Sequence, residues 1–177
     1  MGTNHIGWGD CDIDACGAVP FQSVVAFSGE PFADVAPGVV FKLGTLSYLN
    51  GTSLSTTLIF GATLTVTAIA VDAAGIPVAI DPAVAQMSVW STVNGGVDAF
   101  ADADFLSFDL LPRSFHVFES ASAVADVYGY IDGNPELVFE TLSLPPDQAG
   151  NGFLLPEPGN MALLGLGLAV LGLMRRN

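Results

Sequence analysis

The sequence predicts an all-β fold, an antiparallel β-sandwich or jelly roll of about eight or nine strands followed by one short C-terminal hydrophobic helix. Three observations predict it. Apolar and polar residues alternate with a period of two, most clearly over residues 58–71. Turn-forming residues recur roughly every 8–15 residues, a spacing typical of short strands. Before Met161, no window of about 11 residues has the period of an amphipathic helix.

Three strands are predicted in the first half of the chain: residues 22–27, 39–49 and 58–71. The third has threonines on one face and apolar residues on the other, the pattern of a half-buried strand. A loop with two prolines, residues 30–37, separates the first two strands. Gly44 marks a β-bulge inside the second strand. Asn50-Gly51 is a strong signal for a type I′ hairpin turn between the apolar runs on its two sides.

Five further strands are predicted in the second half: residues 84–90, 104–110, 114–119, 122–131 and 136–144. Turns are predicted over three segments: residues 72–75, 94–96 and 132–135. Pro112-Arg113 is expected to break the chain between two strands, because proline cannot donate to a ladder. These elements place a sandwich domain over residues 1–148, joined by a linker at residues 149–155 to a distinct C-terminal segment.

Residues 156–177 differ in character from the domain. Three parts follow one another there: the motif Pro156-Glu157-Pro158, an apolar block from Met161 to Met174, and the basic tip Arg175-Arg176. As an α-helix the block would span about 21 Å, less than the roughly 30 Å of a bilayer core. Its length is typical of a buried core helix. It has no polar face, however, which favours a helix in a membrane. The arginines would then hold the C-terminus in the cytoplasm.

The order of motif, apolar block and basic tip resembles the PEP-CTERM sorting signal of Gram-negative bacteria. The resemblance covers residues 156–177 and departs from the family in the basic tip, which has two arginines where longer clusters are common. It implies an exported chain that the C-terminal helix holds transiently in the inner membrane and that exosortase processes. The product would reach the cell surface or the extracellular matrix, in association with exopolysaccharide or biofilm.

An exported chain needs a signal peptide with a basic region and an apolar run of roughly 7–15 residues. Residues 1–14 contain neither. We expect that the true start lies upstream, because Trp8 and Cys11 are typical of the first residues of a mature domain. The alternative is that the chain is not exported.

The charge balance limits the partners of the domain. The chain has 18 acidic and 4 basic residues, for a formal net charge of −14. Two of the basic residues are the terminal arginines, so the domain carries only Lys42 and Arg113. Such a surface repels nucleic acid and anionic lipid, and we expect no nucleic-acid partner. With 51% apolar residues, the chain is too apolar to remain disordered.

Four segments of the domain carry a second resemblance: NHIGWG at residues 4–9, FKLGTLSYLNGT at 41–52, ADADF at 101–105, and the stretch from Phe118-Glu119 to Gly150-Asn151-Gly152-Phe153. Together they resemble the choice-of-anchor K domain, an extracellular bacterial domain found with alternative C-terminal anchors. The resemblance spans most of residues 3–153. It implies a location and a fold, but no chemistry, because the family has no established biochemical activity.

Few residues suggest metal or redox chemistry. Cys11 and Cys16 are the only cysteines, and in an oxidising compartment a small disulfide loop is the simplest interpretation. A zinc site needs four ligands, and His5 is the only histidine nearby, although three aspartates are close in sequence. A possible calcium site consists of three acids at close spacing: Asp98, Asp102 and Asp104. The alternative for these acids is a solvated loop. No other cofactor is predicted.

No catalytic motif of the G-x-S-x-G, H-E-x-x-H or phosphate-loop type is found, and we expect no enzyme. His116 is interpreted as a structural histidine. A glycoside hydrolase has only generic carboxylates in its favour. Two hypotheses remain. In the first, the chain is a non-enzymatic surface or matrix protein. In the second, the sandwich is a carbohydrate-binding module in which Trp8 and Trp90 contact glycan, although aromatic residues on strands also serve as core.

Overall fold

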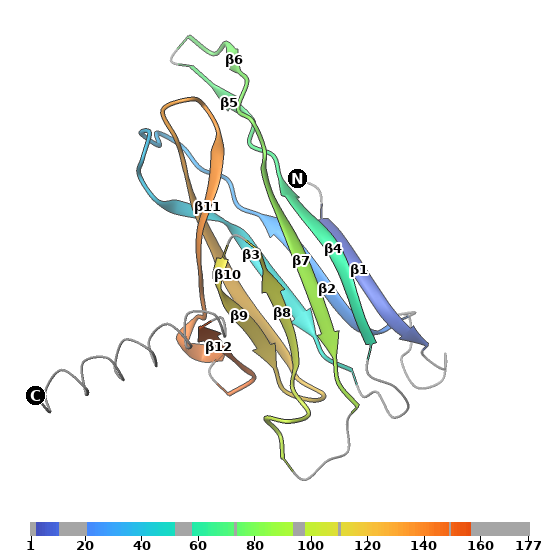
Figure 1. The fold of residues 1–177 in the computed structure, drawn as a ribbon. Coiled ribbons are helices and arrows are strands. Elements are labelled where there is room, and N and C mark those ends of the chain that lie inside the picture. The colour runs from blue at the N-terminus through green and yellow to red at the C-terminus, as the bar shows by residue number, and fades with distance from the viewer. Residues whose placement is uncertain are drawn as a thin grey trace, which may run out of the picture.

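The computed structural model describes residues 3–10, 21–51, 58–72, 74–93, 98–109, 111–148 and 150–156. These residues form two antiparallel five-stranded sheets that face each other, with a small two-stranded sheet at one end (Figure 1). The predicted all-β class and β-sandwich are therefore confirmed for this part of the chain. Within these ranges the only helix is a short 3-10 turn, Pro146–Gln148. The helix expected from Met161 to Met174 lies outside the described residues.

The strands divide between the sheets as follows. Sheet A has the spatial order β1 (Thr3–Asp10), β2 (Phe21–Gly29), β3 (Phe41–Leu49), β10 (Ser122–Ile131) and β11 (Leu137–Ser143). Sheet B has the order β12 (Gly152–Pro156), β9 (Leu111–Val117), β8 (Asp104–Phe108), β7 (Ala83–Ser91) and β4 (Leu58–Val66). The two-stranded sheet pairs β5 (Ala70–Val71) with β6 (Pro77–Val78).

Alternating side chains fill the space between the sheets. β7 has the clearest pattern, because every second residue from Ala83 to Ser91 is buried and the residues between them are exposed. The largest fully buried apolar side chains come from both sheets: Tyr48, Leu46, Val127 and Leu137 from sheet A, and Phe115, Leu106, Val89 and Val117 from sheet B. One face of each sheet is thus committed to the core, and the other is available for contacts outside it.

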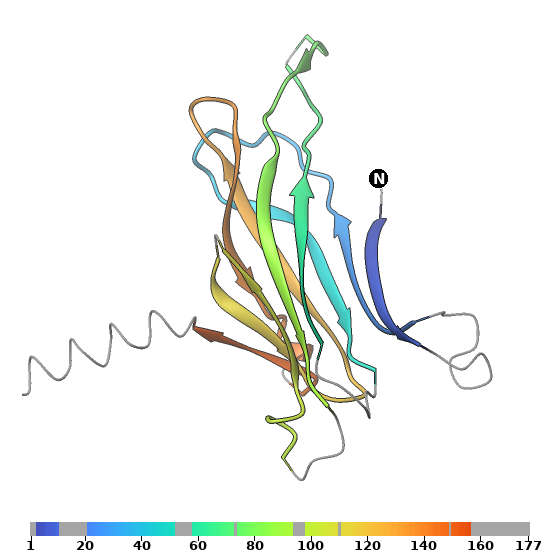
Figure 2. The same ribbon diagram turned by 45° about the vertical axis from the view of Figure 1, so that its right-hand side comes forward.

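β4 and β7 form one long hairpin that continues into β5 and β6 and ends at the predicted turn over residues 72–75. The Asp72 carboxylate stabilises this turn by accepting two backbone N–H groups. The prediction of a single strand over residues 58–71 needs correction, since β4 ends at Val66 and β5 begins at Ala70. The hairpin extends here past the body of the sandwich (Figure 2), and its side chains are exposed, with Ile69 at 89%, Val71 at 62% and Ile76 at 59%.

The predicted hairpin turn at Asn50-Gly51 is wrong. β3 pairs with β2 and β10, whereas β4, the next strand, belongs to sheet B. Neither residue has the positive φ that a type I′ turn requires. The Asn50 side chain is buried and its Nδ2 donates to the Val117 carbonyl at 3.0 Å. The asparagine therefore links the two sheets at the point where the chain leaves sheet A.

Two further predictions are corrected in sheet B. Pro112-Arg113 does not break the chain, because β9 begins at Leu111. Proline is tolerated at the start of a strand, where no ladder donor is needed. The expected linker at residues 149–155 contains most of β12, which pairs with β9 from Gly152 opposite Val117 to Pro156 opposite Arg113. The sandwich therefore extends to Pro156, the first residue of the Pro-Glu-Pro motif.

The predicted bulge at Gly44 is confirmed. The register between β10 and β3 shifts after Val127 pairs with Gly44, so that Tyr128 pairs with Lys42. On the other side, Gly44 lies opposite Gly29 of β2. A Cβ on Gly44 would meet the Ser28 carbonyl oxygen and lie 2.6 Å from the Phe27 ring, whereas a Cβ on Gly29 would meet nothing within 4 Å.

This contrast predicts a difference between two matched substitutions. Gly44→Ala should lower the free energy of unfolding by about 1–3 kcal/mol, because a backbone carbonyl and a packed ring must both move. Gly29→Ala should change it by less than about 0.5 kcal/mol. Urea unfolding of the two variants and the parent measures the difference. Equal stabilities for the two variants would contradict the close approach of β2 and β3 at the bulge.

Candidate functional site

The outer face of sheet B carries a continuous row of large apolar side chains. The strand registers place Ile59 opposite Trp90, Trp90 opposite Phe105, and Phe105 opposite His116. His116 in turn lies opposite Phe153 of β12. The row therefore crosses all five strands, one residue from each. We call the four ring-bearing members, Trp90, Phe105, His116 and Phe153, the aromatic row.

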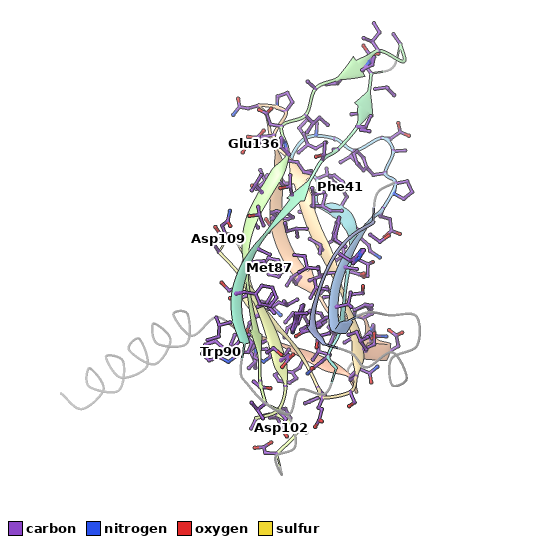
Figure 3. The ribbon with its side chains drawn as sticks, turned by 90° about the vertical axis from the view of Figure 1, so that its right-hand side faces the viewer. Phe41, Met87, Trp90, Asp102, Asp109 and Glu136 are labelled. Carbon is purple, nitrogen blue, oxygen red and sulfur yellow. The ribbon has the colours of Figure 1, made fainter. Side chains whose placement is uncertain are left out.

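The rings of the aromatic row stack on one another. Successive centroids are 5.2, 5.1 and 4.7 Å apart, and the corresponding ring planes differ by 27°, 24° and 14°. Such offset, near-parallel pairs are favourable beyond the area that they bury. Trp90 at one end is 41% exposed, and Figure 3 shows it on the side of sheet B that faces away from sheet A. Phe105, His116 and Phe153 are half-buried.

The other end of the row is covered on one flank. Phe153 contacts Phe118 and Phe100, with centroid distances of 5.3 Å in both cases. Phe118 follows the last residue of β9, so these two rings pack against the row from the end of the sheet. Phe100 itself is 68% exposed, which extends the apolar surface beyond the strands.

On the opposite flank the side chains over three strands are small: the next position on the same face is Gly61 in β4, Ser88 in β7 and Ser107 in β8. On β9 and β12 the corresponding positions are Ser114, which is buried, and Leu155, which is 45% exposed. Ser88 is exposed and Ser107 is half-buried. We call Gly61, Ser88 and Ser107 the serine row. Beyond it, Thr63 Oγ1 donates to Gln86 Oε1 at 3.0 Å.

His116 is uncharged within the aromatic row at neutral pH. Burial lowers its pKa to about 4, because the charged imidazolium loses hydration there. Its Nε2 lies 2.8 Å from the hydroxyl of Ser114, the residue two positions earlier on the same strand. The histidine therefore acts as a fourth flat ring in the row, which agrees with its interpretation as a structural residue.

The acids proposed for calcium occupy two different environments. Asp104 is fully buried, where its Oδ2 accepts the Tyr48 hydroxyl at 2.7 Å and its Oδ1 accepts the Thr92 N–H. Burial raises the pKa of the Asp104 carboxyl. Asp98 is exposed and caps the next turn by accepting the Phe100 N–H. Asp102, 6% exposed, follows in that turn. Among the described residues, no group of three or more His, Cys, Asp or Glu side chains is placed to hold a metal ion.

The two tryptophans predicted to contact glycan are separated by the fold. Trp90 is in the aromatic row. Trp8 is only 8% exposed and packs in the core against Tyr48 and Phe60, at 5.5 and 5.1 Å between ring centroids. The prediction of a glycan contact at Trp8 is therefore wrong, because its ring closes the sandwich between β1 and β4. The remaining members of the aromatic row were not predicted as site residues.

Several other predicted sites lie outside the described residues. They are the cysteines Cys11 and Cys16, the motif residues Glu157 and Pro158, the block from Met161 to Met174, and Arg175 and Arg176. Within the described ranges, no helix has the length and apolar character to cross a membrane.

A cavity of about 510 Å³ opens at the other end of the sandwich, near the start of β5. Phe27, Phe32, Leu43 and Ile69 contribute to its apolar lining, with Glu30 among its polar residues. Its size suits a small ligand. Its lining residues do not form ordered rows of rings and hydroxyl groups as those of sheet B do. The outer face of sheet B is therefore the stronger candidate for a functional site.

Comparisons of the chain with protein-family models, with curated proteins and with solved structures each gave no match. The two resemblances therefore rest on the sequence segments quoted for them. What the fold itself provides is an outer sheet face on which hydroxyl groups lie beside stacked rings.

The lowered pKa of His116 predicts a loss of stability in acid. The unfolded chain takes up a proton near the ordinary pKa of about 6.5, whereas the folded chain resists it until about pH 4. The free energy of unfolding should therefore fall as pH drops through this window, and the loss should be complete below it. His116→Phe keeps a stacked ring but cannot titrate, so its stability should depend less on pH. Urea unfolding of both proteins between about pH 7 and about pH 4 measures this, and parallel profiles would contradict it.

Proposed function

We propose that this chain is a non-enzymatic surface protein whose sandwich domain binds glycan through the outer face of sheet B. The observation that carries the proposal is the aromatic row with the serine row beside it. Pyranose rings present C–H groups on their faces and hydroxyl groups around their rims, so a surface with apolar and hydroxyl rows side by side complements them. One hydroxyl on this face lies beside a base, since Ser114 Oγ is 2.8 Å from His116 Nε2, but Ser114 is only 6% exposed and its oxygen is not presented to a bound polymer, which supports binding over catalysis.

The C-terminal motif supports a second part of the proposal. The order of Pro156-Glu157-Pro158, apolar block and basic tip supports sorting by exosortase through transient attachment to the inner membrane, followed by release to the cell surface or matrix. Because β12 ends at Pro156, the folded domain reaches the motif with no long linker between them. Exopolysaccharide is then the glycan that such a protein would meet.

The binding proposal predicts a specific loss. Trp90→Ala should weaken binding to a soluble glucan by at least about tenfold, because it removes the most exposed ring of the row. Phe32→Ala is the matched control, since it removes an aromatic ring from the cavity at the other end of the domain. Affinity electrophoresis measures binding, and urea unfolding checks that each variant folds. Binding that survives Trp90→Ala but is lost in Phe32→Ala would place the site in the cavity and contradict the proposal.

The sorting proposal predicts a change in mass and location. In a host with exosortase, and behind a cleavable leader, the wild-type chain should lose its C-terminus and leave the inner membrane. A variant without Glu157 should stay uncleaved in the membrane fraction, and a variant ending before Met161 should bypass the membrane. Fractionation with intact-mass measurement distinguishes the three. An uncleaved wild-type chain in the cytoplasm would refute sorting without affecting the binding proposal.

A further inference from the structure

We infer that the outer face of sheet B binds an uncharged, linear polysaccharide whose chain axis runs across the strands, over the serine row and along the flank of the aromatic row. This inference rests on the proposed glycan-binding function and specifies its ligand. Three features support it: the direction of the rows, the flank that is open, and the charge of the surface.

The rows fix the direction. Each row takes one residue from neighbouring strands at the same register, so both rows run perpendicular to the strands. Successive rings follow at 5.2, 5.1 and 4.7 Å, close to the strand spacing of about 4.8 Å. A polymer lying across the strands therefore meets the same pair of environments, ring and hydroxyl or glycine, at several successive steps. A polymer lying along one strand would meet Trp90 once.

Stacking within the row determines where a sugar can lie. Rings that are near-parallel at these distances leave no space for a pyranose between them, so the sugar must approach the row from a flank. One flank is occupied at the Phe153 end by Phe118 and Phe100. The other flank borders Ser88 beside Trp90 and Ser107 beside Phe105, where the side chains are small, and Leu155 beside Phe153. The ligand therefore contacts rings on one side and hydroxyl groups below.

The charge distribution selects an uncharged polymer. Sheet B contains a single cation, Arg113 in β9, and the aromatic and serine rows contain neither a cation nor a carboxylate, so they offer no ion pair to a charged polymer of either sign. The other cation of the domain, Lys42, is in sheet A, where its Nζ lies 2.9 Å from both Glu30 and Asp126. With a formal net charge of −14, the chain repels anionic polysaccharides. A second copy of the chain would carry the same net charge of −14, and this long-range repulsion opposes self-association at this face.

The test uses two substitutions on one strand. Ser88 and Val84 are both exposed on the outer face of β7, four positions apart, but only Ser88 is in the serine row. Ser88→Phe should weaken binding to hydroxyethylcellulose by at least about tenfold, while Val84→Phe leaves it within about twofold. Equal losses in the two variants would indicate a chain lying along the strand and would overturn the inference, while Trp90→Ala would still report on the proposed function.

The charge requirement is tested with a panel of probes. Affinity electrophoresis with hydroxyethylcellulose and a neutral galactomannan should retard the full chain, and alginate and hyaluronate should not, at both low and moderate salt. Binding of alginate that depends on Trp90 would overturn the uncharged ligand class and leave glycan binding standing. If no neutral polymer binds, or if Trp90→Ala changes only the self-association of the chain in sedimentation, both the inference and the proposed function fail.

Discussion

The hydrogen bond between Tyr48 and Asp104 ties the two sheets together inside the core. Both side chains are fully buried, one from β3 and one from β8, and their oxygen atoms are 2.7 Å apart. Burial and then the neighbouring carboxylate raise the pKa of Tyr48, so the phenol stays protonated and donates. A buried carboxyl is tolerated only when its oxygens accept hydrogen bonds. Tyr48 and Thr92 donate those hydrogen bonds to Asp104. The position of β8 against sheet A is therefore fixed by polar geometry as well as by apolar packing.

The outer face of sheet B follows from that constraint. Side chains alternate along a strand, so burying Asp104 directs Phe105 outward, and burying Leu106 directs Ser107 outward. A shift of one residue in β8 would bring Phe105 into the core and leave a carboxylate on the surface. The buried hydrogen bond thus fixes the register of β8. That register in turn directs the β8 members of the aromatic row and the serine row outward. This coupling explains how a sheet can hold an ordered apolar row on a solvent-facing surface.

The sequence predicts local features of this fold better than its long-range pairing. The alternation in β7 and the bulge at Gly44 were predictable, because each depends on residues close together in the chain. The role of Asn50 was not, since its partner is the Val117 carbonyl in the other sheet. Phe105, His116 and Phe153 could be assigned to strands or a linker, but their alignment depends on three registers between strands. Trp8 and Trp90 looked equivalent in sequence, and only the packing of β1 against β4 separates them.

β12 links the two proposed functions within five residues. Phe153 completes the aromatic row and Pro156 begins the Pro-Glu-Pro motif, and both belong to the strand that covers the edge of β9. A cut on the N-terminal side of this strand would remove one ring of the row and expose the backbone donors and acceptors of β9, a template for association with other chains. A cut on the C-terminal side leaves the whole binding face intact. The proposed sorting and the proposed glycan binding are therefore compatible only if processing spares β12, in which case the mature domain would extend to Pro156 or beyond.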